Sequence, residues 1–216
     1  MESTDCTMLE TKKITAMHEG KTVEWHLPQS QAEPRDGEGF LHVIQEQHRA
    51  NFDLWHEEDK ARDPEASDHA ITEVKHAIDR LNQRRNDLVE QIDVRLLEEF
   101  RPAFEAASSA PLHSETPGMM IDRLSILALK IFHTREESER LSATEQHRSK
   151  NRARLELLVE QRDDLAGALA SLFEEMAAGR RRFKLYRQMK MYNDPELNPS
   201  VYQHARARGS QTQAKD

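Results

Sequence analysis

The chain has 216 residues, of which 32% are charged and 37% are hydrophobic, and its formal net charge is -8. This length suits one good-sized domain, and such a composition is typical of long helices that each expose one face to water. No apolar run approaches the roughly 20 residues needed to cross a bilayer, and the first 20 residues lack the apolar stretch of a signal peptide. A single cysteine, Cys6, excludes an internal disulfide framework. We therefore expect a cytoplasmic protein.

The positions of proline define where long helices can form, because proline inside a helix costs roughly 3 kcal/mol. The Pro-free windows are 35–63, 65–101 and 118–194. The last window is too long for one helix. It contains a sequence typical of a capping box, Ser142-Ala143-Thr144-Glu145, and a helix-ending glycine, Gly179. The predicted helices span 38–62, 68–100, 117–140, 143–178 and 180–192. Thr116-Pro117 supplies the third of them with an N-cap followed by Pro at the first helical position.

No alternation of apolar and polar residues typical of strands competes with this pattern. The sequence therefore predicts an all-α fold, a single bundle of about four to five helices over residues 36–199, with several long helices. The flanking segments 1–35 and 200–216 carry no sustained apolar stripe, so we expect both to be loosely ordered and dispensable for folding. The second of them is a basic tail. Trp25 is the residue of the first segment best suited to docking on the bundle.

One face of the predicted helix 38–62 changes from apolar to polar along its length. It begins with Leu41 and Ile44. At helical spacing the same face continues with His48, Asn51, Trp55, Glu58, Asp59 and Arg62. A buried polar group without a partner costs about 1–3 kcal/mol, so these side chains should pair with one another or face a ligand.

The predicted helix 68–100 repeats this pattern in weaker form. Beside its apolar face, which Arg85 interrupts, run Asp79, Asn82 and Asn86. Asparagine is a poor helix former, and solvated helix faces favour Glu and Lys. The two asparagines therefore indicate a site, although a solvated face edged with ion pairs is the alternative interpretation.

The predicted helix 117–140 is apolar on most sides, which indicates a central position. It carries Asp122, Arg123 and Lys130, and charges on a central helix are rarely left unpaired. They either contact a ligand or, as for Asp122 with an arginine of another helix, form a structural ion pair. Tyr192 precedes a helix-stopping Asn-Asp-Pro sequence, where it would serve as a cap over the bundle or as part of a simple turn.

Four ordered blocks of sequence resemble one bacterial family, a domain of unknown function known as the four-two-five-four family. The blocks span residues 51–62, 78–87, 115–127 and 190–199. The resemblance covers roughly residues 38–199. It implies a helical protein associated with bacterial surface-polysaccharide genes, and it brings no assigned activity or catalytic residue.

Motifs of well-known catalytic and metal sites do not occur. A di-metal helical bundle needs two inward Glu-x-x-His pairs, whereas the one pair here, Glu73 and His76, points away from the apolar stripe. The 11 histidines lack the spacing of zinc ligands, and no glycine-rich phosphate loop is found. The acidic body of the chain argues against nucleic acid as a partner.

Two classes of function remain. In the first, facing helices enclose a polar pocket for a small anionic or hydroxyl-rich ligand, such as a nucleotide or sugar phosphate. Its predicted ligand-binding residues are His48, Asn51, Trp55, Arg62, Asn82, Asn86, Asp122, Arg123, Lys130 and Tyr192. If the protein is an enzyme, the candidate catalytic carboxylates, as Mg²⁺ ligands or general base, are Glu58, Asp59 and Asp79. In the second class, the polar residues form a network that fixes helix register in a structural or partner-binding bundle.

Overall fold

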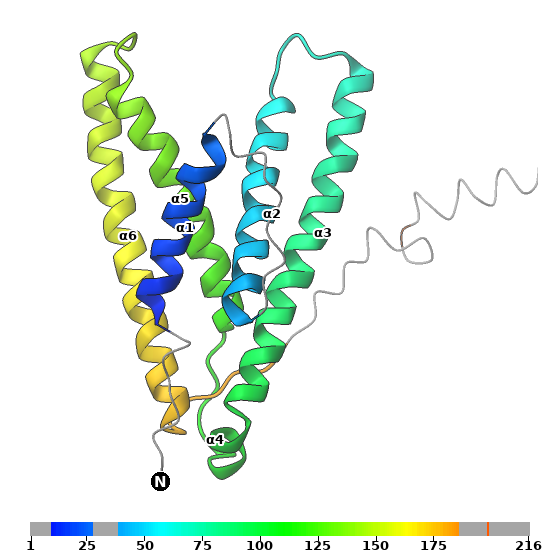
Figure 1. Cartoon of the computed structure of the whole chain (residues 1–216), viewed down its shortest axis with the longest axis vertical. Helices are drawn as coiled ribbons and strands as arrows, with labels where there is room; N and C mark the ends of the chain where they lie inside the picture. Colours follow the sequence, from blue (N-terminus) through cyan, green and yellow to red (C-terminus); the bar gives the residue numbers. More distant parts are fainter. Residues whose placement is uncertain (1–9, 28–38, 186–197, 199–216) are drawn as a thin grey trace, which may run out of the picture. The chain divides into compact units, whose positions relative to one another are not determined.

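The computed structural model describes residues 10–27, 39–185 and 198 of the chain. These residues form six α-helices, α1 (Thr11–His26), α2 (Phe40–Lys60), α3 (Asp68–Glu99), α4 (Arg101–Ala106), α5 (Pro117–Glu139) and α6 (Glu145–Ala177) (Figure 1). The all-α prediction is confirmed. No helix among the described residues is long and apolar enough to span a membrane. The chain divides into two compact units, 1–185 and 186–216, and all six helices belong to the first.

The helices of this first unit pack as two long pairs with α1 between them (Figure 1). α2 packs on α3, and α5 packs on α6. α5 also contacts α1, α2 and α3, which confirms its predicted central position. Its buried side chains include Ile121, Leu124 and Leu129, which are almost completely shielded from solvent. This apolar surface is what the surrounding helices cover.

Two threonines begin the helices of the second pair. Thr116 accepts a hydrogen bond from the backbone N–H of Met119, with Pro117 at the first helical position, as the sequence predicts. Thr144 caps α6 in the same way by accepting from the N–H of His147. α6 therefore begins two residues later than predicted. The bounds of α2, α3 and α5 agree with the prediction to within two residues.

α6 ends in a Schellman motif at Gly179, which has a φ of 67° that favours glycine. The N–H of Gly179 donates to the carbonyl of Met176, and the N–H of Arg180 donates to that of Glu175. The predicted helix 180–192 is wrong for residues 180–185, which are not helical. Instead, the backbone of Arg182 hydrogen bonds with the residues on both sides of Leu112 as an isolated parallel bridge. Residues 186–192 lie outside the described part of the chain.

Helix α1 lies within the segment 1–35, so the prediction that this segment is loosely ordered is wrong for residues 11–26. Its buried face consists of Thr11, Ile14, His18 and Thr22, of which only Ile14 is apolar. An apolar stripe was therefore not visible in the sequence. Ile14 joins the main hydrophobic core, so removal of α1 would uncover that core. The second unpredicted helix, α4, is a short one that follows α3 directly.

The first turn of α5 docks closely on α3 through a buried carboxylate. Asp93 accepts a hydrogen bond from the backbone N–H of Gly118 at 2.7 Å and another from the hydroxyl of Thr116. Burial, the largest cause, raises the pKa of Asp93 to about 6 against these two hydrogen bonds. A Cβ atom on Gly118 would lie 2.7 Å from Oδ1 of Asp93 and 2.8 Å from the backbone oxygen of Val89. The contact between α3 and α5 therefore requires glycine at position 118.

We predict that Gly118→Ala lowers the free energy of unfolding by about 1–3 kcal/mol, because the added methyl group must push the backbone of α3 away from α5. Chemical denaturation monitored by circular dichroism measures this change. The matched control is Gly167→Ala in α6, where a Cβ atom meets nothing within 4 Å. That substitution should stabilise the protein by up to about 1 kcal/mol, the helix preference of alanine over glycine. Equal effects of the two substitutions would contradict the close packing at Gly118.

Candidate functional site

A chain of buried hydrogen bonds connects α1, α2 and α5 at the centre of the bundle. His48 of α2 is fully buried, and its two ring nitrogens contact hydroxyl groups of the neighbouring helices. Nε2 lies 3.0 Å from Oγ1 of Thr22 in α1, and Nδ1 lies 2.7 Å from Oγ of Ser125 in α5. Ser125 also accepts a hydrogen bond from the side-chain amide of Asn51 at 2.9 Å. Three helices are thus joined by polar contacts inside the core.

The donors and acceptors of this chain determine the protonation state of His48. Thr22 donates its one hydroxyl proton to the backbone oxygen of His18, so it accepts from Nε2–H of His48. Nδ1 of His48 is then an acceptor for the hydroxyl of Ser125. Burial, the largest cause, lowers the pKa of His48 to about 3. His48 is therefore a neutral imidazole with its proton on Nε2.

The hydrogen-bond chain ends at a carboxylate that is shared by several partners. Oδ1 of Asp122 accepts from the amides of Asn51, at 2.9 Å, and Gln47, at 2.6 Å. Nε of Arg85 in α3 lies 3.9 Å from the same oxygen. Burial raises the pKa of Asp122, while Arg85 and then Asn51 lower it. Asp122 and Arg85 thus form the ion pair between helices that was the structural alternative for Asp122.

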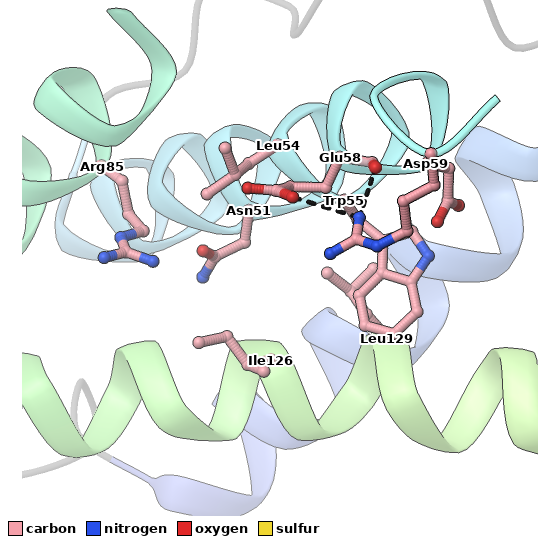
Figure 2. Close-up of a pocket in the computed structure, with 9 residues that line it drawn as sticks. Asn51, Leu54, Trp55, Glu58, Asp59, Arg85, Ile126 and Leu129 are labelled. Atoms are coloured by element: carbon pink, nitrogen blue, oxygen red, sulfur yellow. Dashed lines mark hydrogen bonds and ion pairs between the residues drawn. The ribbon is translucent and has the colours of Figure 1, made fainter. Parts of the chain in front are cut away.

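A cavity of about 300 Å³ adjoins this carboxylate. It lies between α2, α3 and α5, and its lining residues are Asn51, Leu54, Trp55, Glu58, Asp59, Arg62, Arg85, Ile126 and Leu129. Figure 2 shows Arg85 and Asn51 toward one end and Asp59 and Trp55 toward the other, with Glu58 between them and Ile126 on the opposite wall. Leu54, Ile126 and Leu129 make much of the wall apolar. A small concave space with few converging polar groups is typical of ligand sites.

The polar groups of the cavity differ in how they are paired. Arg62 binds Glu58 by an ion pair of 3.1 Å at an exposed position. Asp59 is also exposed to solvent. Within the described ranges, Nε of Arg85 is buried without a hydrogen-bond partner and lies 3.9 Å from Oδ1 of Asp122. Arg85 therefore lines the cavity beside the carboxylate of Asp122.

Of the residues predicted for the site, one group comes together. The cavity lining includes Asn51, Trp55, Glu58, Asp59 and Arg62, and His48 and Asp122 connect to it through Asn51. These residues share the polar face of α2 that the sequence indicates, apart from Asp122, which contacts that face from α5.

Three predicted residues on α3 do not line this cavity. Asp79 pairs with Lys75, one turn away on the same helix, at 2.6 Å. Asn82 and Asn86 are half-buried. From α3, Arg85 reaches the cavity instead, because it lies on the side of the helix that packs toward α5.

The two predicted cations of α5 lie on another face of that helix. Arg123 and Lys130 line a separate groove between α5 and α6, together with Gln161 and Asp164. Arg123 is exposed and makes a bidentate pair with Glu115, with both distances at 2.9 Å. The structure therefore does not bring these cations to the side of Asp122. Tyr192 lies outside the described residues.

Sequence reasoning missed Gln47, Ser125, Thr22 and the role of Arg85. Ser125 is a small polar residue within an apolar stretch and is ordinary in that context. Gln47 neighbours His48 and is fully buried, which its position beside the apolar stripe does not reveal. Arg85 was noted only as an interruption of a core stripe. That interruption was the signal that could have identified it.

Comparison with known protein families identifies a match. A family model described as a protein of unknown function, DUF4254, matches residues 41–185. The chain belongs to this family. The match includes α2 to α6, and therefore every lining residue of the cavity. No curated protein and no solved structure matches the chain.

We predict that Ser125→Ala lowers the free energy of unfolding by about 2–4 kcal/mol, because Nδ1 of His48 and one N–H of Asn51 would each lose a buried partner. Ser138→Ala is the matched control on the same helix. Ser138 is also buried, but its hydroxyl donates only to the backbone oxygen of Arg135, so its loss should cost less than about 1 kcal/mol. Urea denaturation of both variants measures the difference. Equal losses would show that the hydrogen-bond chain does not hold the helices together.

Proposed function

We propose that the cavity between α2, α3 and α5 binds a small phosphorylated or hydroxyl-rich molecule, of the class of sugar phosphates and nucleotides. The observation that carries this proposal is the position of Arg85. Its guanidinium group lines a cavity at a partly buried position beside Asp122, and among the described residues its Nε has no hydrogen-bond partner. A planar guanidinium group matches the geometry of phosphate or carboxylate oxygens.

The nearby Asn51 and Trp55 fit the same class of ligand. Asn51 uses its side-chain amide to donate to Ser125 and Asp122, which leaves its carbonyl oxygen as an acceptor for a ligand hydroxyl. Trp55 is half-buried and offers a flat apolar surface for a sugar or base. Sugar phosphates are the first class to test, since the family resemblance implies an association with surface-polysaccharide genes.

Catalysis in this cavity would depend on two carboxylates of its lining. Glu58 and Asp59 line the cavity, and carboxylates with phosphate oxygens are the usual ligands of Mg²⁺. A phosphorylated ligand that extends from Arg85 along the cavity would bring Mg²⁺ to these two side chains. Asp79 is the weaker candidate of the three predicted carboxylates, because it pairs with Lys75 and does not line the cavity.

One observation favours a structural role for part of the polar residues. The contacts among Thr22, His48 and Ser125 are buried and internally paired. We therefore assign these three residues to helix register, the alternative function, and Arg85, Asn51 and Trp55 to ligand binding. In this proposal, the buried part of the connected polar side chains fixes helix register, and the part that lines the cavity binds the ligand.

We predict that a phosphorylated sugar or nucleotide, with or without Mg²⁺, raises the melting temperature of the wild-type protein by several degrees. A ligand at about 100 times its Kd stabilises a protein by about 2.7 kcal/mol. Arg85→Gln should abolish this shift, because the neutral side chain cannot pair with the anion. A thermal-shift screen of phosphorylated sugars and nucleotides, each compared with its unphosphorylated form, measures both effects.

Arg84→Gln is the matched control for that screen. Arg84 is adjacent in sequence, pairs with Glu46 at 2.5 Å and does not line the cavity. This variant should retain the ligand-induced shift. If no phosphorylated compound shifts the wild type, or if both variants lose the shift equally, the proposed function is wrong.

A further inference from the structure

Three histidines from three helices converge beside the cavity. His26 ends α1, His56 lies in the second half of α2, and His133 lies in the second half of α5. One ring nitrogen of each lies within 4.8 Å of a ring nitrogen of the other two. The ring centroids of His26 and His133 are 5.0 Å apart, and those of His26 and His56 are 5.2 Å apart. All three are half-buried.

The same ring nitrogen is already engaged in each of these histidines. Nδ1 of His26 lies 2.7 Å from the backbone oxygen of Thr22, and Nδ1 of His56 lies 2.8 Å from that of Phe52. Nδ1 of His133 lies 3.1 Å from a carboxylate oxygen of Glu136. Because a carbonyl or carboxylate oxygen only accepts, each Nδ1 carries the proton. Nε2 is therefore the ring nitrogen left with a lone pair for a ligand in each of the three histidines.

These free nitrogens lack other partners within the described part of the chain. Nε2 of His26 and Nε2 of His133 are both buried without a hydrogen-bond partner. Burial, the largest cause, lowers the pKa of His26, and the neighbouring His133 and His56 lower it further, against a hydrogen bond to Thr22 and the charge of Glu136. Buried ring nitrogens without hydrogen-bond partners cost free energy unless something binds them.

We propose that His26, His56 and His133 bind one transition-metal ion, of the class of Zn²⁺, through their Nε2 atoms. Imidazole nitrogens suit Zn²⁺ and the neighbouring first-row metals. Histidine ligands of metals almost always donate their other N–H to a backbone carbonyl or a carboxylate, which is the arrangement of all three Nδ1 atoms here. Zn–N bonds of about 2.0–2.1 Å place ligand nitrogens roughly 3.4 Å apart. The ring nitrogens of the cluster lie within 4.8 Å of one another, so movements of roughly 1.4 Å or less would bring them to that spacing.

The surroundings of the three rings hold them in place for this role. The ring of His26 stacks on Phe132 at 4.1 Å, and that of His133 stacks on Trp55 at 4.9 Å with 10° between the planes. Trp55 also lines the cavity between α2, α3 and α5. Three histidines leave a fourth position of a tetrahedral ion open to water or another ligand, as in catalytic zinc sites. The metal site thus adjoins the cavity and stands independently of whether that cavity binds a phosphorylated ligand.

The test is a titration of the full chain, prepared without a histidine tag and freed of metal by a chelator, with Zn²⁺ in a calorimeter. The wild type should bind one equivalent. His56→Gln and His133→Gln should each weaken binding by about 100-fold or more, since loss of a ligand costs at least as much as loss of its outer partner. Circular dichroism and the melting temperature of each variant without metal establish that it is folded.

His113→Gln is the matched control. His113 is also half-buried, and its Nδ1 also contacts a backbone oxygen, that of Glu115. It lies before the start of α5, whereas His133 of the cluster lies in the second half of that helix. This variant should bind Zn²⁺ like the wild type. X-ray absorption of the zinc-loaded wild type should find three imidazole ligands, and this measurement does not depend on the folding of any variant. The proposal is overturned by a wild type that binds no tighter than about 1 mM, by fewer than three imidazoles, or by an equal loss in His113→Gln.

Discussion

The packing of this bundle depends on one buried imidazole that joins two hydroxyl groups. His48 contacts Thr22 of α1 through one nitrogen and Ser125 of α5 through the other, at 3.0 and 2.7 Å. A neutral imidazole has one donor and one acceptor, so α1 must present a hydroxyl that accepts and α5 a hydroxyl that donates. Each hydroxyl must also lie at the level of His48 along its helix. Apolar side chains tolerate sliding and repacking, whereas an unpaired group in this chain costs about 1–3 kcal/mol. The hydrogen bonds therefore specify the register of α1, α2 and α5.

The register of α2 positions its side chains for two neighbouring places, the cavity and the cluster of three histidines. Asn51 extends the hydrogen-bond chain to Asp122, and the next turns on the same face, at Trp55 and Glu58, line the cavity. Around the helix, His56 points toward His26 and His133. Trp55 contacts both places, because it lines the cavity and stacks on His133. A change in the register of α2 would disturb both arrangements together.

The sequence predicted those features that local chemistry determines. The threonine and proline that begin α5, the glycine that ends α6 and the polar face of α2 all follow from rules that act over one or two turns. α1 escaped prediction because three of its four buried residues are Thr or His, so its inward face shows no apolar period. Arg123 was grouped with Asp122, but adjacent residues on a helix differ by about 100° in direction and face different neighbours.

The remaining features depend on which helices become neighbours. Arg85 and Asp122 are far apart in sequence, and only the packing of α3 on α5 brings them to 3.9 Å. The histidine cluster unites residues of α1, α2 and α5, whereas zinc-ligand spacing can be recognised only when ligands share a helix or turn. The non-helical path of residues 180–185 likewise follows from the pairing of Arg182 with a loop distant in sequence, which local helix preference could not reveal.

The most direct test of the central claim is a measurement of the histidine tautomers by ¹⁵N NMR of the imidazole rings across a pH titration. His48 should remain neutral with its proton on Nε2 throughout pH 5–8, because burial lowers its pKa to about 3. Without metal at neutral pH, His26 should show the opposite tautomer, protonated on Nδ1, because that nitrogen contacts the backbone oxygen of Thr22. A His48 that titrates near the ordinary pKa of about 6.5, or that carries its proton on Nδ1, would contradict the hydrogen-bond chain on which this account of the bundle depends.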